Sequence, residues 1–283
     1  MFMSNPFAEL SAQLSVAVMQ GYIVLMVLLV VGGTILDMMH KKSAKYFFLN
    51  AEKAKKSAKR EVGAGEKIGL TAKVLLVEVL TSGEFKNVKR RLSHLLTMWG
   101  FVIFVATSAI MIFGYPTLDT PTPDILPLLW HLGAGMLCLG GYWFWFFIRV
   151  DVSAEGLSWW RFERADLFIL SLLATATFAL LWSFTQHNGM AGWSTLSLLL
   201  FVGSSVMLFG GVYWSKFAHM FFKPAAALQK RVTRADGSRE GLPREYDLTD
   251  PEVQKLFPDI PEYMGKNPPY MGHGIKREQA KHY

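Results

Sequence analysis

Cysteine is almost absent from this chain, whose 283 residues contain one, Cys138. One cysteine forms no intramolecular disulfide, and it is too few to hold an iron–sulfur cluster. Nucleotide and hydrolase motifs are also missing: the sequence has no Walker loop, no dinucleotide glycine pattern and no convincing Ser/His/Asp set. The sequence therefore excludes a disulfide scaffold and an iron–sulfur protein. If the protein moves electrons, another cofactor or a partner must carry them.

Formal charge is missing from four long runs of the chain. These runs are Leu10–Leu36, Leu92–Leu118, Ile125–Ile148 and Leu167–Ser215. A membrane helix needs about 20 apolar residues, so the last run is long enough for two helices. The polar stretch Gln186–Gly189 permits a turn between them. Because the bilayer core offers the backbone no water, we predict an all-α membrane protein with a bundle of five transmembrane helices.

Basic residues are missing from the start of the chain, where the first is Lys41. Lys and Arg gather between the first two helices, and they return in the loop 149–164 and in the tail 223–283. The positive-inside rule then places the N-terminus outside and these basic segments in the cytoplasm. The first apolar run has no basic region before it, so we interpret it as a retained helix. We predict a multi-pass protein of the cell inner membrane with a cytoplasmic C-terminus.

The alternation of apolar and polar segments predicts four parts. They are a transmembrane helix in 1–38, a basic cytoplasmic loop with amphipathic helices in 39–91, a four-helix transmembrane bundle in 92–222 and an extended cytoplasmic tail in 223–283. The loop contains two helical patterns, Ser43–Arg60 and Thr71–Leu80. The tail is rich in turn residues and too polar to build its own core. It is either disordered or an extended strap that binds a partner through Tyr246, Leu256, Phe257, Tyr263 and Tyr270.

The net charge of +7 is concentrated beside the membrane. Basic residues in that place attract anionic lipid and set the topology. We find no aromatic motif or binding fold of the kind that accompanies nucleic-acid recognition. The charge therefore favours anionic lipid as a partner and argues against nucleic acid.

Four of the seven histidines lie in or at the ends of the predicted membrane helices: His94, His131, His187 and His219. Ionisable side chains are costly in a membrane, so they are candidates for function. The predicted topology places His94 and His219 on the cytoplasmic side, and His131 and His187 on the outer side. Two imidazoles from different helices at one depth can ligate a haem iron from both faces. Ordinary hydrogen bonding is the alternative for each histidine.

Several glycines accompany these histidines: Gly100, Gly133, Gly135, Gly140 and Gly141. They have two interpretations. Glycine lets a porphyrin approach the backbone, and it also lets two membrane helices pack closely.

Two segments, Arg90–Phe101 and Ser215–Pro224, resemble parts of a known family. They are similar to the second and fifth helices of the five-helix membrane cytochrome b subunits of respiratory complexes. These subunits include the nitrate reductase gamma subunit, the heterodisulfide reductase membrane subunit and the quinone-interacting oxidoreductase membrane subunit. The short chain with a long tail most resembles the membrane anchors that accompany adenylylsulfate reductase.

The resemblance implies a cofactor and partners. His94 and His219 would be the axial ligands of the iron in a haem b, and a quinone would react nearby. Arg90, Arg91, Lys216 and Lys223 would face haem propionates or lipid headgroups. Because the chain has no cluster-binding cysteines, the resemblance implies soluble cytoplasmic redox subunits of the flavin or iron–sulfur type.

The sequence departs from the nitrate reductase type at a second pair of positions. Phe104 and Phe201 stand near the places where that type has the histidines of its second haem. One haem is therefore expected. A second, outer haem held by His131 and His187 is kept as an alternative.

We predict a haem b electron-transfer subunit that anchors a cytoplasmic oxidoreductase and links it to the quinone pool. It would be a non-catalytic or quinone-reactive subunit, with sulfur metabolism as one setting. The first alternative is a haem-free structural membrane anchor. The second is a small transporter with histidines as proton relays, which the lack of midplane carboxylates disfavours because Asp37 and Asp166 lie at helix ends.

Overall fold

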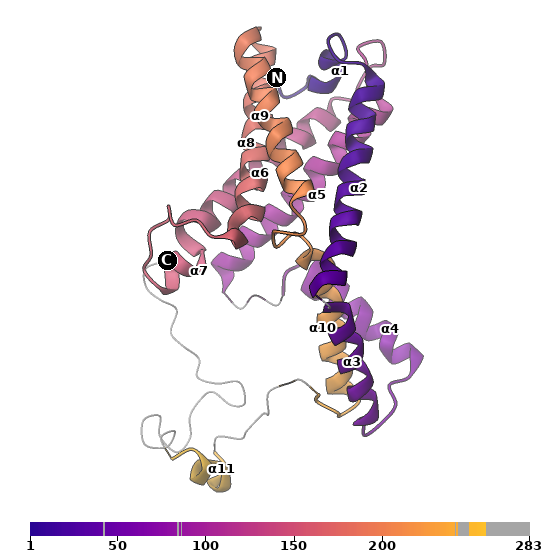
Figure 1. Cartoon of the computed structure of the whole chain (residues 1–283), viewed down its shortest axis with the longest axis vertical. Helices are drawn as coiled ribbons and strands as arrows, with labels where there is room; N and C mark the ends of the chain where they lie inside the picture. Colours follow the sequence, from indigo (N-terminus) through magenta and orange to yellow (C-terminus); the bar gives the residue numbers. More distant parts are fainter. Residues whose placement is uncertain (42, 84, 86, 241, 243–248, 259–283) are drawn as a thin grey trace.

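The chain folds as an all-α membrane bundle in the computed structural model (Figure 1). The structure describes residues 1–41, 43–83, 85, 87–240, 242 and 249–258. Within these ranges the regular elements are helices, and no strand occurs.

Five helices are long and apolar enough to cross a membrane, which confirms the number predicted from the charge-free runs. They are α2 (Val16–Lys41), α5 (Val88–Gly114), α6 (Ile125–Trp143), α8 (Leu167–His187) and α9 (Ala191–Gly210). A π-helix, η2 (Phe144–Ile148), prolongs α6. The helix boundary between α8 and α9 falls at the predicted polar turn, where Gly189 has a positive φ of 67°.

Side-chain caps set where some helices begin. The Asn87 side chain accepts hydrogen bonds from the backbone N–H groups of Lys89 and Arg90, so α5 begins at Val88, ahead of the charge-free run. A short helix, α1 (Pro6–Leu10), precedes α2, and Asn5 caps it in the same way. The chain therefore approaches its first membrane helix through an ordered segment.

Glycines bring α5 and α6 into close contact. A Cβ atom on Gly133 would lie 2.8 Å from the Phe104 backbone nitrogen, and one on Gly140 would lie 2.7 Å from the Ser93 carbonyl oxygen. A Cβ on Gly100 would lie 2.8 Å from the Gly133 carbonyl oxygen. These three glycines pack helix against helix. At these three positions the neighbouring helix lies against the glycine, which supports the close-packing interpretation.

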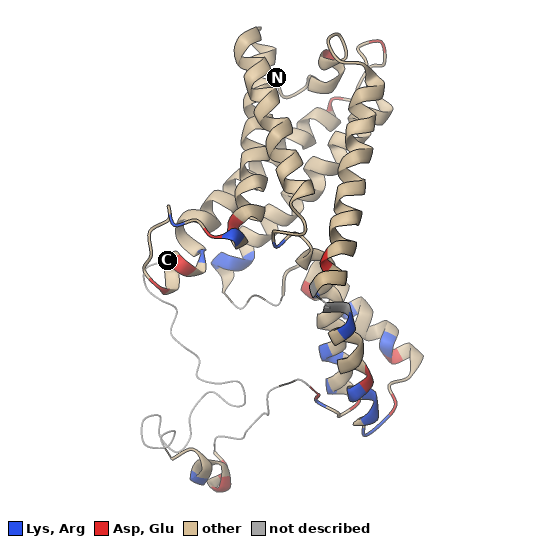
Figure 2. Ribbon diagram, in the orientation of Figure 1, with Lys and Arg blue, Asp and Glu red and all other residues tan. Residues whose placement is uncertain are grey.

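Charged residues gather at one end of the bundle, called here the basic end; the other end is called the opposite end (Figure 2). Arg149 follows η2 at the basic end and is 4% exposed. Its guanidinium pairs with Asp166, lies 2.9 Å from Asp151 and stacks 4.4 Å from the centre of the Trp145 ring. This cluster joins the end of the third membrane helix to the start of the fourth. The short helices α7 (Val150–Ala154) and η3 (Arg164–Asp166) flank it.

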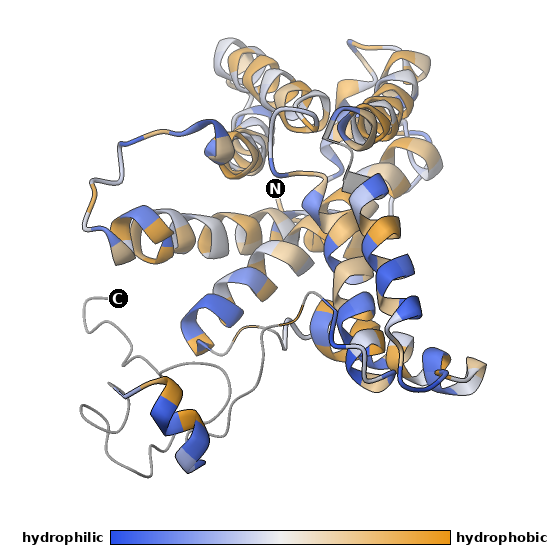
Figure 3. Ribbon diagram, turned by 60° about the horizontal axis from the view of Figure 1, so that its bottom comes forward, coloured by the Kyte–Doolittle hydropathy of each residue, from blue (hydrophilic) through white to orange (hydrophobic). Residues whose placement is uncertain are grey.

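Four elements form a helical platform beyond the basic end (Figures 1 and 3). They are α3 (Ser43–Lys56), α4 (Ala64–Lys73), the π-helix η1 (Val74–Val79) and α10 (His219–Ala235). The α10 helix contacts α3, α4 and η1. Arg231 of α10 donates from Nε to Glu78 Oε1 of η1 at 2.6 Å. The predicted extended tail is therefore wrong for residues 223–235, which are helical and packed.

Hydrogen bonds among Arg60, Glu66 and the end of α10, called here the clasp, connect the parts of the platform furthest from the membrane helices. Arg60 binds the Glu66 carboxylate through two hydrogen bonds of 2.9 and 2.6 Å, and its Nε donates to the Ala235 carbonyl at 2.6 Å. The Asp236 carbonyl accepts from the backbone N–H groups of Lys59 and Arg60. The hydrogen bond from Arg60 lowers the pKa of the Glu66 carboxyl below its ordinary value. The clasp thus covers the C-terminal carbonyls of α10.

Beyond the platform the structure describes one more helix, α11 (Pro251–Leu256), capped by Asp250. Leu256 and Phe257 lie at its end and are exposed. The other expected anchors, Tyr246, Tyr263 and Tyr270, lie outside the described residues. The role of this part of the tail as a strap stays a prediction.

Candidate functional site

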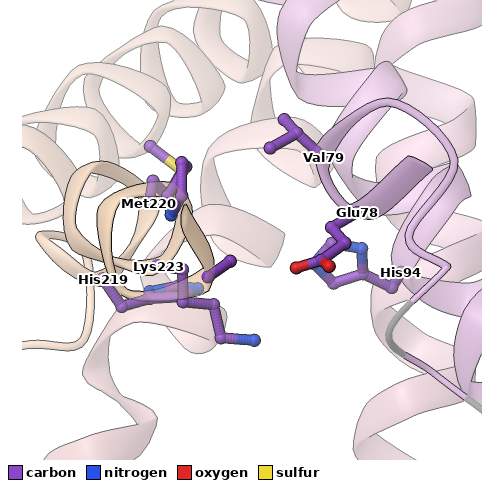
Figure 4. Close-up of a pocket in the computed structure, with 8 residues that line it drawn as sticks. Glu78, Val79, His94, His219, Met220 and Lys223 are labelled. Carbon is purple, nitrogen blue, oxygen red and sulfur yellow. The ribbon is translucent and has the colours of Figure 1, made fainter. Parts of the chain in front are cut away.

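A pocket at the basic end brings His94 and His219 together (Figure 4). These residues are far apart in the sequence, one in the second turn of α5 and the other at the start of α10. In Figure 4, His94 and Glu78 lie on one side of the pocket, and His219, Met220 and Lys223 lie on the other. Val79, Pro224 and Ala227 complete the lining. The two histidines that the sequence placed at one depth therefore line the same pocket.

His94 is held by the chain that leaves η1. Ser82 is fully buried and has a positive φ of 50°, an uncommon conformation for a residue other than glycine. Its Oγ lies 2.8 Å from His94 Nδ1. The Phe85 ring packs 4.9 Å from the imidazole, centre to centre. The turn after η1 therefore fixes the orientation of the His94 ring.

His219 is held by the turns between α9 and α10. The membrane helix α9 ends at Gly210, and the chain turns through 211–218 before α10 begins at His219. His219 Nδ1 is hydrogen-bonded to the Lys216 carbonyl oxygen. The Phe168 ring meets the imidazole edge-on at 5.7 Å. Both pocket histidines are thus anchored through Nδ1.

The donor set fits a bis-histidine haem. Histidines that bind a metal commonly use one ring nitrogen for the metal while a hydroxyl or carbonyl oxygen orients the other. Here Ser82 Oγ meets Nδ1 of His94 and the Lys216 carbonyl meets Nδ1 of His219, so Nε2 would be the nitrogen to bind iron if a haem were held here. The pocket volume is about 90 Å³, below the roughly 300–1,000 Å³ typical of ligand pockets. A porphyrin therefore requires α10 to stand further from η1 and α5 than it does here.

The four basic residues expected around a haem have different positions. Lys223 lines the pocket, and its Nζ lies 5.3 Å from the centre of the Phe85 ring. Arg90 and Arg91 instead support the backbone: Arg90 donates to the Ile148 carbonyl at 3.0 Å, and Arg91 donates to the Thr81 carbonyl at 2.8 Å. Lys216 contributes its carbonyl oxygen to His219. Of the four, Lys223 is placed to meet an anionic group in the pocket.

The histidines at the opposite end take part in separate hydrogen bonds. His131 is 4% exposed; its Nδ1 lies 2.7 Å from the Pro127 carbonyl and its Nε2 lies 2.8 Å from Ser183 Oγ. His187 is exposed, and its Nε2 lies 3.0 Å from the amine of Met1. Both ring nitrogens of His131 are therefore engaged by the protein. An outer haem held by this pair stays a prediction, without support from this geometry.

Aromatic rings fill the interior between the two ends. Phe104 and Phe201 approach each other with ring centres 6.3 Å apart. Phe104 packs on Trp130 at 5.2 Å, and Phe201 stacks on Trp182 at 5.8 Å. Phe104 and Phe201 therefore belong to a packed core.

Two polar residues of the site were not identified from the sequence. Glu78 lines the pocket while its carboxylate pairs with Arg231. Ser82 orients His94. The dipeptide Ser82–Gly83 does mark the end of the helical pattern, but a turn signal of this kind does not show which side chain it will meet. These contacts depend on the path of the chain back to α5.

We compared the chain with protein-family models, curated proteins and solved structures, and none matches. The arrangement of His94 and His219 is consequently interpreted from its own geometry.

Proposed function

We propose that this protein is the membrane subunit of a redox complex and that His94 and His219 hold one haem b at the basic end. The observation that carries the proposal is the pair of imidazoles in one pocket, each oriented through Nδ1 by an oxygen atom. The packed rings of Phe104 and Phe201 favour a single haem over two.

The residues of the pocket would have different roles in holding the haem. His94 and His219 supply neutral nitrogen ligands, and Ser82 and the Lys216 carbonyl hold them at fixed angles. Lys223 offers a cation for a propionate at the pocket's edge. Bound haem supplies one-electron transfer. A quinone that exchanges electrons with it would bind within the membrane near that haem, lined by α5 and by the ends of α6 and α9 at the basic end.

The platform at the basic end supports docking of a soluble redox subunit of the flavin or iron–sulfur type. Two regions are available to such a partner: the lysine-rich helix α3 of the platform and, further along the tail, the helix α11. Two contacts on one partner strengthen binding beyond either alone. By the positive-inside rule this end faces the cytoplasm. Truncation after Glu240 keeps α10 and its clasp, and it should release the partner from the membrane while the haem remains.

The decisive measurement is a reduced-minus-oxidised visible spectrum of the purified protein. The wild type should show a low-spin b-type signal, and His94→Ala and His219→Ala should each abolish it. His187→Ala is the matched control, because this histidine is exposed at the opposite end, and its spectrum should match the wild type. A signal that persists in both pocket variants would contradict the ligand assignment.

The haem-free anchor is the competing function, and the platform gives it a structural basis. A wild-type protein that binds its redox partner but shows no haem signal would establish that alternative. Quinone-dependent electron transfer by the intact complex further distinguishes the haem subunit from the haem-free anchor. An anchor without a haem does not carry electrons, so blocking a quinone site in this subunit would not affect the transfer.

A further inference from the structure

We infer that the end of η1 and the turn after it are embedded in the bilayer leaflet at the basic end. The occupant of the exposed apolar face of α4 and η1 is then lipid. The sequence places this segment in an aqueous loop, so the inference adds a membrane contact to the five spanning helices. It is independent of any cofactor in the pocket.

Three contacts set the depth of the segment. The Trp99 indole N–H donates to the Leu80 carbonyl at 3.2 Å, and Arg91 Nε donates to the Thr81 carbonyl at 2.8 Å. Ser82 Oγ lies 2.8 Å from His94 Nδ1. Trp99 lies seven residues beyond Leu92, the first residue of the charge-free run of α5. At about 1.5 Å per residue, its backbone is roughly 10 Å past the start of that run.

The outer face of α4 and η1 is apolar and exposed. Ile68, Leu75 and Leu76 are spaced to lie on one helical face, and they are 70%, 48% and 58% exposed. The inner face is different: Val74 is buried, and Glu78 pairs with Arg231 of α10. Water is a poor environment for such an outer face, whereas the boundary of the acyl chains is a favourable one.

The exposed face continues into the lipid-facing surface of α5. Leu80 is exposed where it meets Trp99, and Leu92 is exposed one turn from the start of that helix. Tryptophan is enriched at the membrane interface. Lys67 and Lys73 flank the apolar residues, and their long stems can carry the ammonium groups to the headgroups. This continuity identifies lipid, rather than a protein partner, as the occupant.

The backbone of the turn meets the requirement for residence at this depth. The Gly83 N–H donates to the Val77 carbonyl at 2.8 Å, and the Leu80 N–H donates to the Leu75 carbonyl at 2.9 Å. The carbonyls of Leu80 and Thr81 accept the two side-chain hydrogen bonds from α5. Backbone outside a helix is tolerated at membrane depth where protein covers it, and Ser82 at the centre of this turn is fully buried.

Lipid contact can be measured with single labels, because Cys138 is the one native cysteine. In a Cys138→Ala background, Leu76→Cys carries a fluorophore in nanodiscs of phosphatidylcholine and phosphatidylglycerol. Ser57→Cys at the end of α3 is the aqueous reference, and Leu139→Cys on the exposed face of α6 is the lipid reference. Quenching by nitroxide-labelled lipid is compared with quenching by iodide at all three positions.

The expected result is that Leu76→Cys follows Leu139→Cys, with strong quenching by labelled lipid and weak quenching by iodide. If Leu76→Cys follows Ser57→Cys, the face is in water and the inference is overturned. Protection from both quenchers would overturn it as well, because protein would then cover the face. The background variant is checked for unchanged folding by its thermal transition before labelling.

Discussion

The histidines at the two ends of the bundle have different surroundings. At the opposite end His131 is buried, with hydrogen bonds on both ring nitrogens, and Phe7 seals the bundle against Trp130 and Trp182. At the basic end His94 and His219 line a pocket. Depth in the membrane therefore identifies a histidine as a candidate, but the packing around it distinguishes a histidine enclosed in the core from one that lines a pocket.

The largest expected loss of stability follows removal of the seal at the opposite end. Phe7 is 5% exposed, and its ring contacts Trp130 and Trp182 with centres 5.8 and 5.4 Å apart. Phe7→Ala should destabilise the protein by about 3–5 kcal/mol, because it leaves a cavity between the two indoles. Thermal unfolding in detergent measures the loss. Phe113→Ala, at an exposed ring of α5, is the control and should change the stability much less.

A smaller loss is expected at the α5–α6 contact, which joins the two ends. Gly133→Ala would place a methyl group 2.8 Å from the Phe104 backbone nitrogen, so the helices must separate. Overpacking of this kind costs about 1–3 kcal/mol. Gly135→Ala in the same helix meets no atom within 4 Å and should be neutral or slightly stabilising. Equal unfolding temperatures for the two variants would show that the close approach has no energetic role.

The His131 variant sharpens the comparison between the ends most directly. His131→Ala removes two hydrogen bonds and leaves Ser183 without this partner, at a cost of about 1–3 kcal/mol. The expected signature is a lower unfolding temperature with an unchanged visible spectrum. His187→Ala, at an exposed position, should change neither property. Loss of a haem signal in His131→Ala at full stability would instead establish the outer haem.

Much of the membrane part could be predicted, because a spanning helix needs a continuous apolar run and such a run can be read directly from the sequence. The charge-free runs located all five spanning helices, and the polar stretch Gln186–Gly189 located the turn between α8 and α9. The platform could be predicted only in part: helices were expected at Ser43–Arg60 and Thr71–Leu80, where α3 and η1 lie, but α10 was not expected. Pro224 indicates a break, yet it lies inside α10, and packing against η1 through Arg231 and Glu78 holds the helix in place. Such contacts between distant segments leave no periodic signal.

The pocket could be predicted only in part, because its residues come from distant segments of the chain. Topology placed His94 and His219 at one depth, and the structure brings both to one pocket. The partner of His94 depends on Ser82, whose positive φ comes from the path of the chain. The roles of Arg90 and Arg91 differ from the expectation because backbone carbonyls lie within their reach.

The smallest effect is expected at the clasp, where the basic end relies on exposed polar contacts. Glu66→Gln weakens the two hydrogen bonds to Arg60, and Arg60 loses part of its hold on the Ala235 carbonyl. The readout is hydrogen exchange at the amides of Lys59 and Arg60, which donate to the Asp236 carbonyl. Exchange there should quicken by a few-fold at most, since exposed ion pairs contribute little.

The pH dependence of this small effect identifies its cause. Arg60 lowers the pKa of Glu66 in the folded protein. The carboxylate's contribution is therefore fully present above the unfolded pKa, about 4.3, and is lost as the pH falls through the lower folded value. The difference between wild type and Glu66→Gln should be largest near neutral pH and vanish in acid. A difference that stays constant across this range would mean that the substitution acts through packing, because charge would then have no part in holding the clasp closed.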